Sequence, residues 1–308
     1  MLLMKKILLI FPFILILSFS SFADYPSLKK ISKNSTFMDG DGKPYLIENI
    51  TNKENILLII WNHGSEPDHK KDPCKLKPRY EWEGAIIPAV LRLHNKKINN
   101  LTIKIYRLCS GVKGMDVKDQ KKIRKSIKKG EELDLFTEYK QLKRQNIILA
   151  KADEFLKDSF ENIVLVGYSA GGWASLNLQS RFPNKFRGAI AFNPAFAGPK
   201  KEWQKKYPEW GAFRDHQIKI IVQSDSLRAL LFAHKDDIFE DPETLSFFKS
   251  FTDLKFIDYS KLKPTSCTWA DVDEKMQKNK GHNIPQSNCF TKHIKQNNYL
   301  INYLEELF

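Results

Sequence analysis

The chain has 308 residues and a formal net charge of +14, which falls to +12 if Lys5 and Lys6 leave with a signal peptide. The positive charge is mostly lysine scattered along the whole chain, and no nucleic-acid-binding module is recognisable, so we expect no nucleic acid as a partner. One α/β domain commonly fills a chain of this size, and we therefore expect a single domain.

The first residues predict a secretory signal peptide. Two lysines precede an apolar run over residues 7–17, and small residues then lead to Ala23, after which we expect cleavage. A retained membrane anchor is the competing interpretation, but the apolar core is shorter than the roughly 20 residues that a bilayer span needs. We therefore expect residues 24–308 to be periplasmic or secreted, without a stable membrane anchor.

Four cysteines in a chain bound for an oxidising compartment predict two disulfides. We favour the pairs nearest in sequence, each of which brackets a different loop system: Cys74 with Cys109, and Cys267 with Cys289. A metal site built from Cys74, His63 and His69 is the alternative, but its spacing matches no zinc-ligand pattern. We therefore expect no metal and no other cofactor.

Strand and helix signals alternate along the chain. Two short segments between residues 37 and 47 flank Asp39-Gly40-Asp41-Gly42, which predicts an antiparallel hairpin. Apolar runs predict strands at 56–61, 101–108, 163–166, 189–192, 230–233 and 254–257, and helices are expected at 82–94, 135–156, 241–251 and 294–307. This alternation predicts an α/β fold with a mostly parallel central sheet and helices on both faces.

Three longer segments, near residues 110–134, 194–226 and 259–281, are expected to be loop insertions in the single domain. The second contains four aromatic residues, Trp203, Tyr207, Trp210 and Phe213. They could form an apolar wall or lid over the site, or they could be core residues of a helix.

The motif Gly167-Tyr168-Ser169-Ala170-Gly171 fits the pattern G-x-S-x-G. Its glycines suit a sharp strand-to-helix turn that lifts the serine hydroxyl above the sheet. A β-branched run precedes the motif and a helix-prone segment follows it, as this turn requires. The sequence therefore predicts Ser169 as a nucleophile.

A serine nucleophile needs a base, and the base needs an acid to orient it. His282 lies in a polar segment before the closing helix, where the base is expected. Asp236 and Asp237 follow the strand at 230–233, at a carboxyl end where such sheets place their chemistry. We prefer Asp236 as the acid and keep Asp237 in reserve.

Two backbone N–H groups are expected to bind the oxyanion. One is that of Ala170, directly after the serine, and the other is that of Ser65 in the segment His63-Gly64-Ser65 after a buried strand. His63 is interpreted as a residue that braces this segment rather than as a second base.

With these motifs the chain resembles the α/β-hydrolase family, and within it the dienelactone hydrolase and serine peptidase branch. The resemblance covers nearly the whole chain after the signal peptide and rests on His63-Gly64-Ser65, the motif around Ser169, Asp236 and Gly281-His282. It implies a sheet of about eight strands and acyl-transfer chemistry, without fixing one substrate.

The sequence thus predicts an exported serine hydrolase that cleaves a carboxylic ester through an acyl-enzyme. Its partner would be a small-molecule or peptide acyl substrate. A secreted serine peptidase of the same fold and a non-catalytic exported binding protein are the alternatives. A serine, an acid and a histidine in the required chain order argue against the binding protein.

Overall fold

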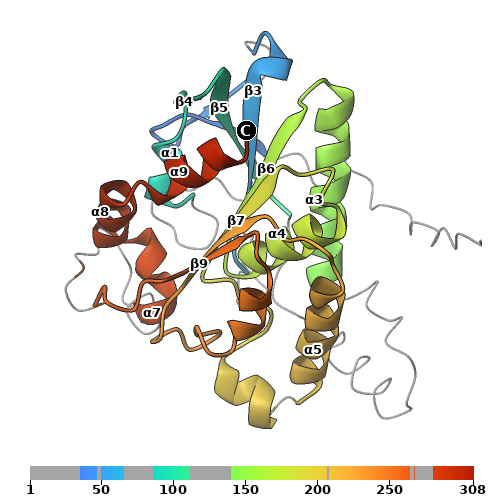
Figure 1. Cartoon of the computed structure of the whole chain (residues 1–308), viewed down its shortest axis with the longest axis vertical. Helices are drawn as coiled ribbons and strands as arrows, with labels where there is room; N and C mark the ends of the chain where they lie inside the picture. Colours follow the sequence, from blue (N-terminus) through green and yellow to red (C-terminus); the bar gives the residue numbers. More distant parts are fainter. Residues whose placement is uncertain are drawn as a thin grey trace, which may run out of the picture.

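The computed structural model describes residues 35–46, 50–65, 86–110, 140–206, 208–263, 267 and 280–308. Within these residues a nine-stranded, mostly parallel sheet has helices on both of its faces (Figure 1). The α/β class predicted from the sequence is therefore confirmed.

The strands follow the order β2-β1-β5-β3-β6-β7-β8-β9, and β4 pairs with β5 outside this path. β1, β2 and β4 make antiparallel pairs, whereas β3 and β5 to β9 pair in parallel with one another. The strands are β1 Thr36–Met38, β2 Pro44–Tyr45, β3 Ile56–Asn62, β4 Lys97–Ile98, β5 Leu101–Leu108, β6 Asn162–Tyr168, β7 Gly188–Phe192, β8 Ala229–Ala233 and β9 Leu254–Asp258. Each strand expected from an apolar run is present, as is the hairpin.

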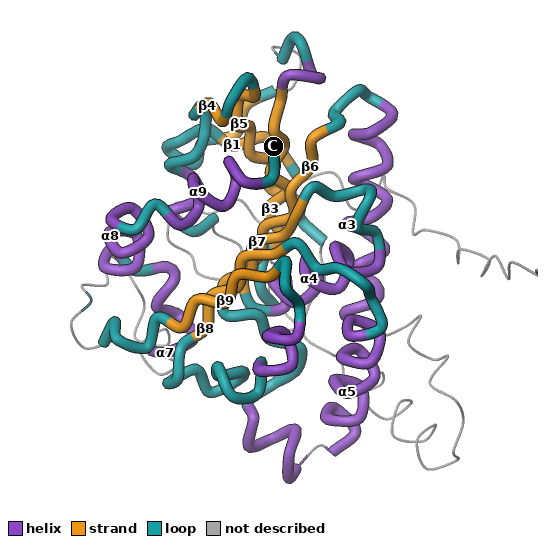
Figure 2. Tube along the Cα trace, viewed as in Figure 1, coloured by secondary structure: helices purple, strands orange, loops and turns teal. Residues whose placement is uncertain are grey.

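The helices are α1 Pro88–Leu91, α3 Lys140–Lys157, α4 Ala170–Arg181, α5 Pro208–Val222, α7 Lys280–Asn283, α8 Asn288–Gln296 and α9 Tyr299–Glu306. Short 3-10 helices lie at Lys53–Asn55, Ser246–Ser250 and Ile284–Gln286, and a π-helix lies at Glu202–Lys206. In Figure 2, α3, α4 and α5 lie on one side of the sheet and α8 and α9 on the other.

Two hydrophobic clusters separate the sheet from its helices. Along β3, every residue is buried and successive side chains enter opposite clusters, as the pleat of a strand requires. Leu58 and Ile60 join the cluster that contains residues of α3, α4 and α5. Leu57 and Ile59 join the cluster that contains residues of α1, α8 and α9. The apolar run that predicted a buried strand is thus explained by helices on both faces.

Three expected helices differ from the structure. Among the described residues of the helix expected at 82–94, only α1, Pro88–Leu91, is helical, and turns follow it. The closing helix is two helices, α8 and α9, separated where Asn298 takes a left-handed conformation with φ 50°. The segment 241–251 consists mostly of turns and a 3-10 helix, because Oδ1 of Asp241 accepts a hydrogen bond from the backbone N–H of Thr244 and closes a local turn. In the closing helix and in 241–251, an Asn or Asp residue favours a local turn over a helix interior.

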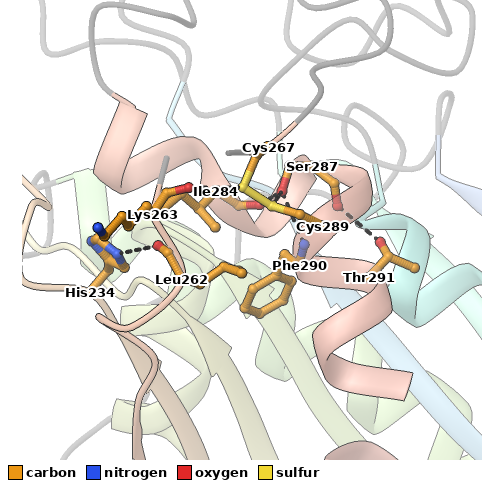
Figure 3. Close-up of a disulfide and its surroundings, with 9 residues drawn as sticks. All are labelled: His234, Leu262, Lys263, Cys267, Ile284, Ser287, Cys289, Phe290 and Thr291. Atoms are coloured by element: carbon orange, nitrogen blue, oxygen red, sulfur yellow. Dashed lines mark hydrogen bonds between the residues drawn. A yellow bond between two sulfur atoms is a disulfide. The ribbon is translucent and has the colours of Figure 1, made fainter. Parts of the chain in front are cut away.

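One expected disulfide, between Cys267 and Cys289, joins the segment after β9 to α8 (Figure 3). Their Cα atoms are 5.2 Å apart. Cys109 is also disulfide-bonded, and its expected partner, Cys74, lies outside the described residues.

The signal peptide, His69 and Tyr207 lie outside the described residues as well, as does all but Ser110 of the expected insertion at 110–134. In the part of the chain that the structure describes, no helix is long and apolar enough to cross a membrane. The expected insertion at 194–226 is not a simple loop, since it contains α5.

Candidate active site

Ser169 occupies the sharp turn between β6 and α4. Its backbone has φ 54° and ψ −125°, a conformation that costs a non-glycine residue about 1–3 kcal/mol. A Cβ atom on Gly167 would lie 2.4 Å from the carbonyl group of Gly171, so the turn requires glycine there. Ser169 itself is 7% exposed. The sequence motif thus forms the strained turn that its glycines predict.

The start of α4 packs directly on the end of β3. A Cβ on Gly171 would lie 2.0 Å from the carbonyl oxygen of Asn62 and 2.5 Å from that of His63. The side-chain amide of Asn62 also donates to Oγ of Ser175 at 2.9 Å. This close approach brings the His63-Gly64-Ser65 segment beside the helix that begins at Ala170, as an oxyanion site built from both would require.

His282 lies in the short helix α7, where its ring meets a buried carboxylate. Nδ1 of His282 is 2.7 Å from Oδ2 of Asp237, and the two side chains are 3% and 0% exposed. A carboxylate only accepts hydrogen bonds, so Nδ1 carries the proton and Nε2 of the neutral ring is left as the acceptor.

The preference for Asp236 over Asp237 is corrected by this geometry. The Asp236 side chain is 51% exposed, and its carboxylate lies 3.8 Å from Nδ1 of His234 rather than on His282. The backbone N–H groups of Asp236 and Asp237 donate to Nδ1 and to the carbonyl of His234, respectively. This turn directs the Asp237 side chain inward, where Oδ1 also accepts from the N–H of Phe239 at 2.8 Å.

Asn193, at the end of β7, holds the turn that carries His282. Its Nδ2 donates to the carbonyl oxygens of Gly281 and His282 at 3.0 and 2.9 Å. Its Oδ1 accepts from the hydroxyl of Tyr259 at 2.7 Å. Burial, reinforced by the charge of Asp237, raises the Tyr259 pKa well above its usual value, so this hydroxyl stays a donor.

Tyr168 connects the serine turn to the histidine turn. Its hydroxyl lies 2.6 Å from Oδ1 of Asn283 and 3.1 Å from the carbonyl oxygen of His282, and its ring centroid is 5.1 Å from that of His282. Tyr168 precedes Ser169 directly, so the two turns are fixed to one another. Sequence reasoning missed Asn193 and the role of the Tyr168 hydroxyl, since their partners are 66 to 115 residues away along the chain.

A buried ion pair supports the acid-bearing segment. Nε and Nη2 of Arg214, on α5, bond to the two carboxylate oxygens of Glu240 at 2.6 and 2.9 Å. Burial raises the pKa of Glu240, against the opposing effect of Arg214. The guanidinium also lies 4.9 Å from the ring centroid of Trp203. Trp203 and Phe213 are both buried, so for these two aromatics the interpretation as packed residues holds.

His63 braces its segment, as expected. The residue is fully buried, and its ring nitrogens meet the carbonyl oxygen of Gly64 and the Oγ of Ser110 at 2.6 and 3.0 Å. Within the described residues no group of three or more His, Cys, Asp or Glu side chains could hold a metal ion.

The strand-to-helix serine turn follows a central parallel strand, and the carboxylate and histidine come from later segments in the chain order serine, acid, histidine. The chain has the α/β-hydrolase fold. The fold alone does not identify a reaction, because α/β-hydrolase folds host many functions.

No protein-family model and no curated protein matches the chain. Among solved structures it is similar to Est1E from Butyrivibrio proteoclasticus, with 13% identity, a TM-score of 0.47, and coverage of 88% of this chain and 98% of that one. It is also similar to a Bacteroides ovatus protein named as a dipeptidyl aminopeptidase IV, with 14% identity and a TM-score of 0.46, and to Pyrococcus horikoshii acylaminoacyl peptidase, with 12% identity and a TM-score of 0.43.

These two matches cover 73% and 79% of this chain but only 32% and 37% of the other proteins. The chain therefore spans about a third of their length. Similarities this remote say nothing of a reaction, which has to follow from the site's own geometry.

Proposed function

We propose that this protein is an exported serine hydrolase that cleaves a carboxylic ester through an acyl-enzyme. The buried contact between Nδ1 of His282 and the carboxylate of Asp237 carries the proposal. A histidine whose Nδ1 proton is held by a carboxylate has its other nitrogen free to accept a proton. The bonds from Asn193 and Tyr168 fix this histidine turn relative to the strained turn of Ser169.

In the proposed reaction, Oγ of Ser169 attacks the ester carbonyl carbon while Nε2 of His282 takes the hydroxyl proton. Asp237 stabilises the imidazolium that forms. The oxyanion accepts hydrogen bonds from the N–H groups of Ser65 and Ala170. His282 then protonates the leaving alcohol, and the carbonyl re-forms as an acyl-enzyme.

Water completes the cycle by the same route. His282 takes a proton from water, the resulting hydroxide attacks the acyl carbon, and the Ser169 oxygen leaves with the proton that His282 returns. Each step is acid–base and acyl-transfer chemistry within the serine, histidine and aspartate, and its proton balance needs no further group.

Two features support export. Lys5 and Lys6 precede an apolar run, and a predicted cleavage site follows at Ala23. The disulfide between Cys267 and Cys289 is a bond that persists in oxidising compartments. We therefore propose a periplasmic or secreted location for the mature chain. Mass determination of the N-terminus of exported protein tests this directly, and an uncleaved N-terminus would contradict it.

An ester rather than an amide is the proposed substrate. The experiment compares p-nitrophenyl esters of increasing acyl length with aminoacyl-nitroanilides, using the wild type and Ser169→Ala. We expect ester turnover in the wild type and a fall of about 10⁴-fold or more in Ser169→Ala. Turnover of nitroanilides alone would change the substrate class to peptides, and ester turnover retained by Ser169→Ala would overturn the mechanism.

A further inference from the structure

Helix α3 places two buried polar side chains against both segments of the proposed oxyanion site. Nη1 and Nη2 of Arg144 donate to the carbonyl oxygens of His63 and Gly64 at 2.6 and 3.3 Å. One turn earlier on the same helix, Nε2 of Gln141 donates to the carbonyl oxygen of Ala170 at 3.2 Å. Arg144 is 1% exposed and Gln141 is 2% exposed. One helix face therefore holds the end of β3 and the start of α4 together.

The direction of the Ser65 N–H follows from the position of Arg144. The described residues contain no cis peptide bonds, and in a trans peptide the carbonyl and the next N–H point in opposite directions. Because the Gly64 carbonyl is turned toward the guanidinium, the N–H of Ser65 is turned away from α3. Arg144 thus fixes the orientation of the donor that the proposed mechanism uses.

The same carbonyl is also polarised. The Gly64 oxygen accepts from Nδ1 of His63 at 2.6 Å in addition to Arg144, and a guanidinium is always charged in proteins. Hydrogen bonds in a chain strengthen one another, because an amide whose oxygen accepts strongly has an N–H that donates strongly. Two donors on the Gly64 oxygen, one of them charged, therefore make the Ser65 N–H a better oxyanion donor.

Hydrogen bonds to both ring nitrogens hold His63 in place. Since the Gly64 carbonyl only accepts, Nδ1 of His63 carries the proton, and Nε2 accepts from the backbone N–H and the hydroxyl of Ser110 at 3.3 and 3.0 Å. Ser110 follows the disulfide-bonded Cys109. The segment that ends at Ser65 is therefore fixed from the side of β5 as well as from α3.

We propose that Arg144 is a positioning residue for the oxyanion hole: it orients and polarises the peptide group that joins Gly64 to Ser65. This inference rests on the proposed function, since it takes the Ser65 N–H as an oxyanion donor. It predicts that Arg144 affects the tetrahedral intermediate far more than it affects the binding of substrate in its ground state.

The test compares Arg144→Met and Arg144→Lys with Gln145→Met as the matched control. Gln145 is buried on the same helix, but its side-chain bonds go to Gln217 and Arg181 and not to the proposed oxyanion segments. The readouts are kcat and KM on a p-nitrophenyl ester and inhibition by phenylboronic acid, which adds to a serine hydroxyl as a tetrahedral anion. Circular dichroism and the melting temperature report folding for each variant.

We expect Arg144→Met to lower kcat by about 10²-fold, the effect of a lost oxyanion donor, with KM changed by less than about threefold. Phenylboronic acid should bind more weakly in the same proportion. Arg144→Lys, which retains a charged donor, should fall between wild type and Arg144→Met, and it provides the test if Arg144→Met does not fold. Gln145→Met should lower the melting temperature and leave kcat unchanged.

Wild-type kcat in folded Arg144→Met would overturn the inference, and so would a loss of kcat with phenylboronic acid affinity unchanged. Either result leaves the serine mechanism intact, because the wild type still turns over. An inactive wild type would instead remove the proposed function, and the inference with it.

Discussion

Gly281 packs against the backbone of Asp236 so closely that a Cβ atom on the glycine would lie 2.0 Å from the Asp236 carbonyl oxygen. The same Cβ would lie 2.6 Å from the N atom of Asp237. The turn that carries His282 and the turn that carries its carboxylate are thus in direct backbone contact. This contact allows His282 of α7 to form its hydrogen bond with Asp237, 45 positions earlier in the chain.

Gly281→Ala is therefore expected to separate His282 from Asp237. The clash is with backbone atoms, which cannot move aside as a side chain can, and a displacement of about 1 Å at a catalytic group can lower the rate about 10²-fold. Gly40→Ala is the control, since its Cβ would lie 3.8 Å or more from its nearest neighbours. Ester-hydrolysis rates of the two variants check this, and equal rates would contradict the contact.

The two adjacent aspartates predict opposite results. Asp237→Asn should lower kcat by about 10⁴-fold, because an amide at this position favours the wrong tautomer of His282. Asp236→Asn should remain within about threefold of wild type, since its carboxylate is half exposed and does not contact His282. Steady-state kinetics of both variants test this. A larger loss of kcat in Asp236→Asn than in Asp237→Asn would restore Asp236 as the acid, as preferred from the sequence.

The strained backbone of Ser169 predicts that an inactive glycine variant is more stable than an inactive alanine variant. At φ 54° and ψ −125°, serine and alanine have backbone strain because of their Cβ atom, and glycine does not. Ser169→Gly should therefore be more stable than Ser169→Ala by about 1–3 kcal/mol, and both should be inactive. Thermal or denaturant unfolding measures the difference. A Ser169→Gly variant less stable than Ser169→Ala would mean that the turn is not strained.

The disulfide between Cys267 and Cys289 brackets the stretch of chain that contains His282. In the chain-entropy model, a bridge that closes a loop of this length stabilises the folded state by about 3 kcal/mol, because it restricts the unfolded chain. Since the sheet has its own core, we expect Cys267→Ser with Cys289→Ser to lower activity under conditions in which circular dichroism is unchanged. Full activity in the double variant would show that the hydrogen bonds of Asn193 and Tyr168 suffice to hold His282.

The sequence predicts those parts of the fold and site that depend on neighbouring residues. Continuous apolar runs locate the buried strands, and the glycines around Ser169 locate the strained turn, because both are properties of a short segment. The choice between Asp236 and Asp237 depends on how a turn bonds to His234, which adjacent carboxylates do not reveal. Arg144 likewise acts through carbonyls about 80 residues away in the chain.

Covalent labelling of the native protein by a fluorophosphonate, followed by mass mapping of the modified peptide, tests directly whether Ser169 is an activated nucleophile. Such a probe reacts with a serine only where a neighbouring base activates it. The proposed mechanism predicts one adduct on Ser169, absent in Ser169→Ala and formed much more slowly in Asp237→Asn. An unlabelled protein, or a label on a different serine, would contradict the assignment of Ser169 as an activated nucleophile.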